Sequence, residues 1–168
     1  GPSAFSFSPE RDLLGLDGGD VTTTKLLDFP LDNLLYDKNI YGDLLTGSLG
    51  LDILMDFDGN NDLWNHLTGA SYGFIIPGTG TYVTVGNSGG RQSGIGYKNT
   101  QLDGTLCGGY CAYDPDDYYS YYWLWDLYDL IKVKRKILQA HEVRPYEYGQ
   151  FPVPVDIGNS AISGGSFD

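Results

Sequence analysis

The sequence predicts an all-β, mainly antiparallel fold with one short helix near residues 128–140, and a β-sandwich is the alternative arrangement. Three observations lead to this prediction. Glycine and tyrosine are abundant, at 24 and 14 of 168 residues. Charged residues make up only 19%, below the usual quarter. Short runs of β-branched and aromatic residues recur between glycine-bearing turns, which is typical of strands rather than of helix bundles.

The length fits one domain with its own core, because 41% of the residues are hydrophobic and 14% are aromatic. We therefore expect a single β-rich domain over residues 4–168. Residues 1–3, which begin with Gly-Pro, resemble the remnant of a cleaved purification tag.

The chain up to residue 55 predicts short elements. Residues 4–8 alternate and then meet a turn cluster, which predicts a short strand that runs into a turn. Residues 21–24 form a β-branched run. From 26 to 55, leucine and aspartate recur without a period of 2 or 3.6, so we expect short strands and loops there.

The pattern after residue 71 is clearer, with four strand candidates at 72–76, 81–85, 95–98 and 121–125. Turns that contain glycine separate the first three candidates, so an antiparallel meander is the simplest connection.

The period then changes to that of a helix. Apolar residues and one lysine fall on a single helical face over residues 128–140, and Asp126 or Asp129 is positioned to cap its start. Pro145, Pro152 and Pro154 exclude a long central strand or a helix beyond it. The last residues, 162–168, look like the beginning of a strand.

Residues 71–126 resemble one blade of a β-propeller, because a blade is a four-stranded antiparallel meander. Residues 163–168 and 5–10 resemble the first strands of further blades. The resemblance implies that the chain is a fragment of a larger propeller, a truncated relative, or one protomer of a closed assembly. The strand start at residues 162–168 has no partner left in the sequence, so we expect it to pair either with residues 5–8 or with a neighbouring copy, the second as a homo-oligomer.

The charge distribution limits the partners. The formal net charge is −12, and acidic residues dominate residues 10–62, so nucleic acid is not an expected partner. One basic run, at residues 132–136, is interpreted as a solvated face; the alternative is contact with a membrane or an anionic glycan. No apolar stretch reaches the roughly 18 residues that a membrane span needs.

The two cysteines, Cys107 and Cys111, lie in a Cys-Gly-Gly-Tyr-Cys segment. The glycines let the chain turn tightly, so we expect a small disulfide ring that fixes a loop rather than the fold. A disulfide predicts an oxidising compartment, and hence an extracellular or secreted protein. A zinc site would need two more soft ligands nearby, and only His66 and His141 exist.

A calcium-binding loop is predicted at residues 56–62. Oxygen ligands at alternate positions point to one side when a loop wraps a hard cation. The spacing supplies four of them: Asp56, Asp58, Asn60 and Asp62. The stretch departs from the EF-hand pattern, which has a glycine at the sixth place and a glutamate at the twelfth. The alternative is a surface turn rich in Asp and Asn.

An aromatic and acidic cluster over residues 110–125 provides the candidate ligand site. Aromatic faces stack on the C–H groups of sugars, and carboxylates accept hydrogen bonds from hydroxyls. Strand alternation sends residues 122 and 124 to one face and residues 121, 123 and 125 to the other, so one set fills a core. The residues expected to bind a ligand are Tyr113, Asp116, Tyr119, Tyr121, Trp123 and Trp125; burial in a core or an interface is the alternative.

These observations favour a non-catalytic extracellular recognition module that binds a carbohydrate or protein partner through aromatic and acidic loops. A self-assembling structural protein is one alternative. A carbohydrate-active hydrolase with two aspartates is another, but the many aspartates select no catalytic pair, and no catalytic residue is assigned.

Overall fold

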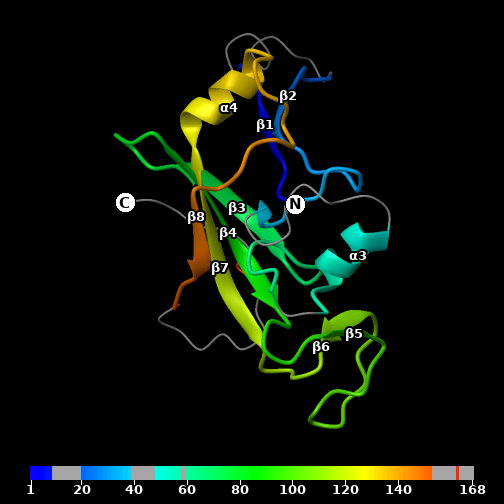
Figure 1. Cartoon of the computed structure of the whole chain (residues 1–168). Coiled ribbons are helices and arrows are strands. Elements are labelled where there is room, and N and C mark those ends of the chain that lie inside the picture. Colours follow the sequence, from blue (N-terminus) through cyan, green and yellow to red (C-terminus); the bar gives the residue numbers. More distant parts are fainter. Residues whose placement is uncertain (9–19, 39–47, 58–59, 153–161, 163–168) are drawn as a thin grey trace.

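The structure, a computed structural model, describes residues 1–8, 20–38, 48–57, 60–152 and 162. These residues are mainly antiparallel β structure, as the sequence predicts (Figure 1). The elements in chain order are β1 Ala4–Ser6, β2 Thr24–Leu27, α3 Ser48–Met55, β3 Gly69–Ile75, β4 Thr81–Gly89, β5 Ile95–Tyr97, β6 Tyr110–Ala112, β7 Tyr118–Asp126, α4 Leu127–Lys134 and β8 Glu147–Gln150.

A four-stranded sheet of order β3-β4-β7-β8 lies at the centre of the molecule. Its strands follow one another in chain order, as in a meander. The β5–β6 hairpin is inserted between β4 and β7, and α4 between β7 and β8. β4 and β7 pair along their whole length of 9 residues each, from Thr81↔Asp126 to Gly89↔Tyr118.

The third strand of the expected meander is therefore a different segment. Residues 95–97 leave the sheet and pair with β6 instead. The chain turns away at Gly90, whose φ of 72° is in the left-handed region, and the short strand ends at Lys98, with a φ of 50°. The long aromatic strand β7 takes the place beside β4, because it can pair with that strand at every position.

The core lies on one face of the central sheet. Tyr121, Trp123 and Trp125 are 3%, 0% and 0% exposed, whereas Tyr122 and Leu124 on the other face are partly exposed. This confirms the alternation predicted for the strand. Burying one such side chain stabilises the fold by roughly 1.5–3 kcal/mol.

The buried indoles are hydrogen-bonded as well as packed. Trp123 Nε1 donates to the Leu63 carbonyl at 3.0 Å, and Trp125 Nε1 donates to Thr84 Oγ1 at 2.9 Å. Because each buried N–H has a partner, these hydrogen bonds offset the cost of desolvating the two indole N–H groups.

Helix α4 covers one end of this core. Asp126 caps its start and accepts a hydrogen bond from Tyr128 N, which confirms one of the two predicted caps. The helix ends at Lys134, earlier than the predicted residue 140. Lys136 adopts a left-handed φ of 59°, its N–H donates to Val133 O, and Ile137 N donates to Lys132 O. These two bonds form a Schellman motif, which ends the helix.

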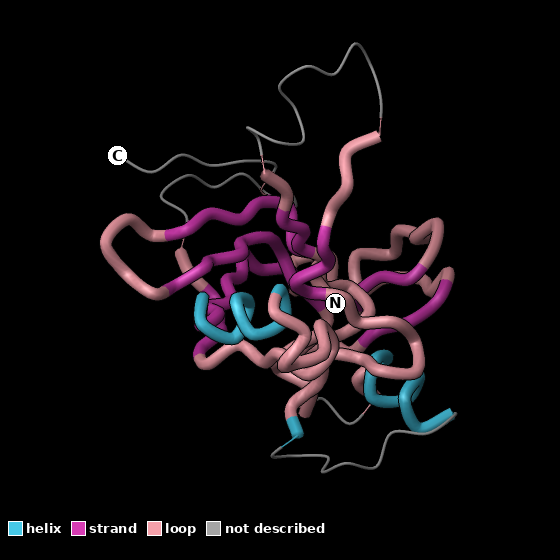
Figure 2. The backbone as a smooth tube through the Cα atoms, turned by 90° about the horizontal axis from the view of Figure 1, so that it is seen from above, coloured by secondary structure: helices cyan, strands magenta, loops and turns pink. Residues whose placement is uncertain are grey.

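The N-terminal part of the chain packs against the same core. β1 and β2 form a two-stranded antiparallel sheet in which Phe5 is paired with Lys25. Leu27 and Phe29 are buried, and Phe29 lies 6.2 Å from Trp125 between ring centroids. Helix α3 falls in a region where the sequence predicts only strands and loops. Figure 2 shows that α3 and α4 lie well apart.

β8 is an edge strand of 4 residues that lies between Pro145 and Pro152. This fits the expectation that the prolines exclude a long central strand. The strand start expected at 162–168 lies outside the described residues, except for Ile162. The described residues form one blade-sized sheet and no ring of blades, so the propeller stays an expectation. Within the described ranges, no helix is long and apolar enough to cross a membrane.

Candidate functional site

The β5–β6 hairpin, residues 95–112, projects from the end of the central sheet opposite α4 (Figure 1). Tyr97 and Tyr110 face each other across the two strands. Beyond the strands, Cys107 N donates to Asn99 O at 3.2 Å, so the hairpin continues as an ordered loop. Ile95 and Ala112 at its base are buried, whereas Tyr97 and Tyr110 are exposed and available to a partner.

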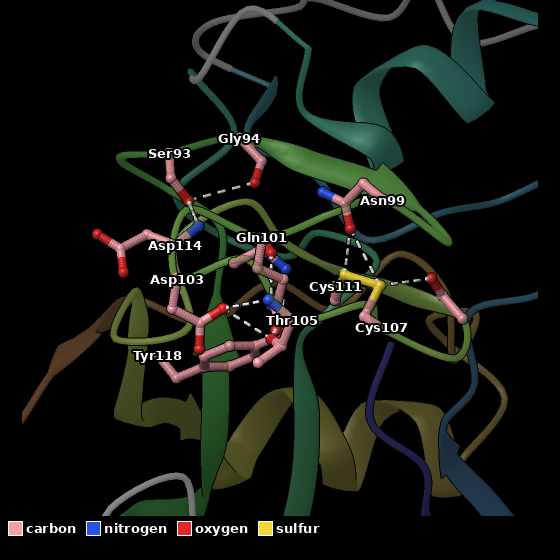
Figure 3. Close-up of a disulfide and its surroundings, with 12 residues drawn as sticks. Ser93, Gly94, Asn99, Gln101, Asp103, Thr105, Cys107, Cys111, Asp114 and Tyr118 are labelled. Atoms are coloured by element: carbon pink, nitrogen blue, oxygen red, sulfur yellow. Dashed lines mark hydrogen bonds between the residues drawn. A yellow bond between two sulfur atoms is a disulfide. The ribbon is translucent and has the colours of Figure 1, made fainter.

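The predicted disulfide joins Cys107 and Cys111, whose Cα atoms are 6.5 Å apart. Figure 3 shows Asn99 directed at the bridge, with Oδ1 3.0 Å from Cys107 Sγ and 2.6 Å from Cys111 Sγ. Gln101 Nε2 donates to Ala112 O at 3.0 Å. The bridge closes a short ring within the hairpin, so it holds this loop rather than the central sheet.

The base of the hairpin is held by the carboxylate of Asp117, which is 4% exposed. Its Oδ2 accepts hydrogen bonds from Gln92 N at 3.0 Å, Ser93 N at 2.6 Å and Ser93 Oγ at 2.7 Å. Its Oδ1 accepts from the Tyr119 hydroxyl. One buried carboxylate therefore ties the turn before the hairpin to the strand after it.

The electrostatics of this carboxylate follow from its partners. Burial raises the pKa of Asp117, but hydrogen bonds from Tyr119, Ser93 and Gln92 outweigh burial and the net pKa is lowered. Burial and the hydrogen bond to Asp117 raise the pKa of Tyr119. At neutral pH Asp117 is thus an ionised acceptor and Tyr119 a neutral donor.

Three rings form an exposed surface on the hairpin and beside it, which we call the aromatic face: His66, Tyr97 and Tyr110. The His66 and Tyr110 centroids are 3.9 Å apart, and those of Tyr97 and Tyr110 are 4.9 Å apart. Tyr97 is 59% and Tyr110 45% exposed. Lys98 Nζ lies 5.4 Å from the Tyr97 centroid.

His66 joins the aromatic face from a different part of the chain. The backbone N–H of His66 donates to Leu54 O at 2.7 Å, and this bond fixes the loop of His66 against helix α3. Partial burial lowers the pKa of His66, so its ring is neutral at physiological pH. The face therefore offers three uncharged rings with one cation at the edge.

The residues that the sequence assigns to a ligand are divided between surface and core: Tyr113, Asp116, Tyr119, Tyr121, Trp123 and Trp125. Tyr113 and Asp116 are exposed. Tyr119 is half-buried, and its hydroxyl donates a hydrogen bond to Asp117. The last three are core residues at 3% exposure or less, and this corrects their assignment to a ligand. They point inward because their face of β7 is the one that meets α4 and the N-terminal strands.

The predicted calcium ligands are Asp56, Asp58, Asn60 and Asp62. In the part of the chain that the structure describes, they do not form a metal cluster. Asp56 is 2% exposed and its Oδ1 accepts from Asn61 N at 2.8 Å. Asp62 is paired with Arg91 at 3.3 Å, and Asn60 is exposed. Asp58 lies outside the described residues. No group of three His, Cys, Asp or Glu side chains suited to a metal occurs in the described ranges, so calcium stays a prediction.

The sequence does not predict the aromatic face. Tyr97 and His66 lie in separate segments, and His66 meets Tyr110 only through the tertiary fold. The one local signal is the pairing of β5 with β6, which would place two tyrosines opposite each other.

Comparison with protein-family models, with curated proteins and with solved structures gives no match for this chain.

Proposed function

We propose that this protein is a non-catalytic extracellular recognition module that binds a carbohydrate or protein partner through the aromatic face. The observation that supports this most directly is the exposure of two adjacent tyrosines, at 59% and 45%, whose rings are tilted at 53° to each other on a hairpin held by a disulfide and by Asp117. A rigid aromatic surface loses little conformational entropy on binding, so it suits recognition.

The chemistry of the face suits both kinds of partner. Tyrosine rings stack on the C–H face of a sugar while their hydroxyls bond to its hydroxyls. The same rings are enriched in protein interfaces. Leu102 and Leu106, at 74% and 73% exposure, extend the apolar surface of the hairpin, and this favours a protein contact beside the rings.

The disulfide supports the extracellular setting, because such bonds persist in oxidising compartments and are rare in the cytosol. Both cysteines of the chain are used in it, and neither is left free.

The hydrolase alternative is less well supported at this site. A glycosidase needs one carboxylic acid that is protonated and one carboxylate that is free to act as a base or nucleophile. Asp117 is the most buried carboxylate near the aromatic cluster, but its oxygens already accept four hydrogen bonds and its pKa is lowered. It is therefore a structural acceptor and a poor acid.

The test uses Tyr97→Ala and Tyr110→Ala, with Tyr128→Ala as the matched control. Tyr128 is 69% exposed and lies on α4 at the other end of the sheet. The three proteins and the wild type are applied to a panel of immobilised glycans and extracellular proteins. We expect the two hairpin variants to lose roughly tenfold or more of the affinity for the wild-type binder, because central aromatics dominate interfaces.

Equal losses in all three variants would contradict the proposal, since the control ring is remote from the aromatic face. Turnover of any glycan in the panel would favour the hydrolase instead. Melting curves of each variant confirm that the loss is not due to unfolding.

A further inference from the structure

We propose a second binding site, at the end of the sheet opposite the aromatic face, that takes an anionic saccharide. The site is the groove between β2 and the segment that follows α4. It is independent of the proposed function of the hairpin and uses other residues.

The groove has a volume of about 440 Å³. Ligand pockets commonly range from about 300 to 1,000 Å³, so it can receive one or two sugar rings. Its lining includes Lys25, Asp28, Pro30, Lys136, Leu138 and His141. The recess exists because Val133 and Leu138 pack toward the core, and the chain then runs back beside β2.

Positive charge is concentrated around this recess in a protein of net charge −12. Lys132 is already paired with Asp129 at 2.8 Å, and Lys25 with Asp28 at 2.7 Å. Lys134, Arg135 and Lys136 are exposed and form no ion pair with any residue that the structure describes. Lys136 lines the groove, and Lys134 and Arg135 come directly before it in the chain, so this end of an otherwise acidic surface attracts an anion.

Lys136 has a further property that sets it apart. It occupies the left-handed position of the Schellman motif, with a φ of 59°, where glycine is the favoured residue. A lysine there is conformationally unfavourable, and its side chain lines the groove. This is consistent with a role for the charge rather than for the turn.

The mixed lining of the groove indicates a sugar rather than a membrane or an acidic peptide. Asp28 and His141 can exchange hydrogen bonds with hydroxyls, and Pro30 and Leu138 offer apolar surface to C–H groups. A flat lipid surface would not enter a recess. An extended acidic peptide would need cations spaced along its length, whereas Lys25 and Lys136 line a single groove.

The experiment measures binding by calorimetry at two salt concentrations, with defined probes. The anionic saccharides are an oligogalacturonate and a heparin tetrasaccharide, which separate carboxylate from sulfate recognition; maltotetraose is the neutral counterpart. Polyglutamate and phosphatidylserine vesicles represent the other classes. The variants are Arg135→Gln with Lys136→Gln, and Lys98→Gln on the hairpin is the control for charge.

We expect at least one anionic saccharide to bind, more weakly at the higher salt concentration, and maltotetraose not to bind. The double variant should weaken this binding roughly 3- to 10-fold, as loss of two exposed charge contacts does. Lys98→Gln and Tyr97→Ala should leave it unchanged, and the second of these separates this site from the aromatic face.

Several results would overturn the proposal. They are binding of no anionic saccharide, equal binding of maltotetraose, an unchanged affinity in the double variant, and preference for polyglutamate or vesicles over the anionic sugars. Cations near a helix C-terminus also stabilise the helix. A double variant that melts at a lower temperature without any saccharide binding by the wild type would assign them to that role alone.

Discussion

Replacing Asp117 by alanine should release the base of the hairpin from the central sheet. The carboxylate accepts from two backbone N–H groups, at 3.0 and 2.6 Å, and from two hydroxyls. The hydroxyls can rotate toward water, but the N–H groups of Gln92 and Ser93 are fixed by the turn. Each such bond to a charged acceptor contributes about 1.5 kcal/mol at the low end of its range, so the loss is about 3 kcal/mol.

Thermal unfolding followed by circular dichroism measures this loss. At this chain length 1 kcal/mol corresponds to about 2–4 °C, so the melting temperature should fall by about 6–12 °C. Asp116→Ala is the matched control, because its carboxylate is exposed and its change should stay within about 0.5 kcal/mol. If the two variants have the same melting temperature, Asp117 does not anchor the hairpin.

The same variant has a predicted pH dependence. The folded pKa of Asp117 is lowered, so its contribution to stability is fully present above the unfolded value of about 3.9. It is lost as the pH falls through the lower, folded pKa. The free energy of unfolding in urea should therefore be higher for the wild type than for Asp117→Ala at neutral pH, and this difference should become smaller in acid. A difference that stays constant with pH would refute the view that Asp117 acts as an ionised acceptor.

Three further predictions concern other parts of the chain. Lys136→Gly should raise the free energy of unfolding by about 0.5–1 kcal/mol, because glycine adopts the left-handed conformation without strain. An unchanged or lower value would show that the backbone of Lys136 is not strained. Native protein should show no alkylatable thiol, and reduction of Cys107–Cys111 should lower stability by about 2 kcal/mol at most while the far-ultraviolet spectrum is kept. Calcium should raise the melting temperature of the wild type but not of Asp58→Ala; identical curves with calcium and with chelator would rule out the loop site.

Local patterns identify most strands here but not their partners. Residues 81–85 and 121–125 fall within strands of the central sheet, and the candidate at 72–76 matches β3 except for Ile76, because β-branched and aromatic residues recur there. The pattern at 95–98 is equally strand-like, yet this strand pairs with β6 and not with β4. Partner choice depends on the length of ladder that two strands can form, and β7 offers a much longer one to β4.

The existence and the ends of the helices are harder to predict from the sequence than the strands. α3 has no acidic residue in its first turn and no basic residue in its last turn, and it contains Gly50 within a leucine-rich stretch that has no helical period. Helix propensity therefore does not predict it. The helical period and the cap predict α4, but its end is set by the conformation of Lys136. A lysine in the left-handed region is not visible in the sequence, because lysine is an ordinary helix residue.

The candidate site shows the same limit. Alternation along β7 separates Tyr122 from Tyr121 and Trp123, but it does not say which set is inside, since both faces carry large apolar side chains. That is decided by the elements that cover the sheet. α4 and Leu27 of β2 belong to the core on the Trp123 side.

The edges of the central sheet bear on the self-assembling alternative. β8 is an edge of only 4 residues between prolines, which limits its pairing with another chain. β3 is longer, but its register shifts between Ala70 and Tyr72, and such a bulge interrupts the regular ladder that an incoming strand would extend. Because neither edge favours pairing with another chain, the two ends of the sheet remain as the surfaces for partners.

We therefore expect the molecular mass from light scattering to stay that of a monomer over a hundredfold range of concentration. A mass that rises with concentration, and that falls back when a lysine replaces Ile75 on the β3 edge, would instead establish edge-to-edge assembly.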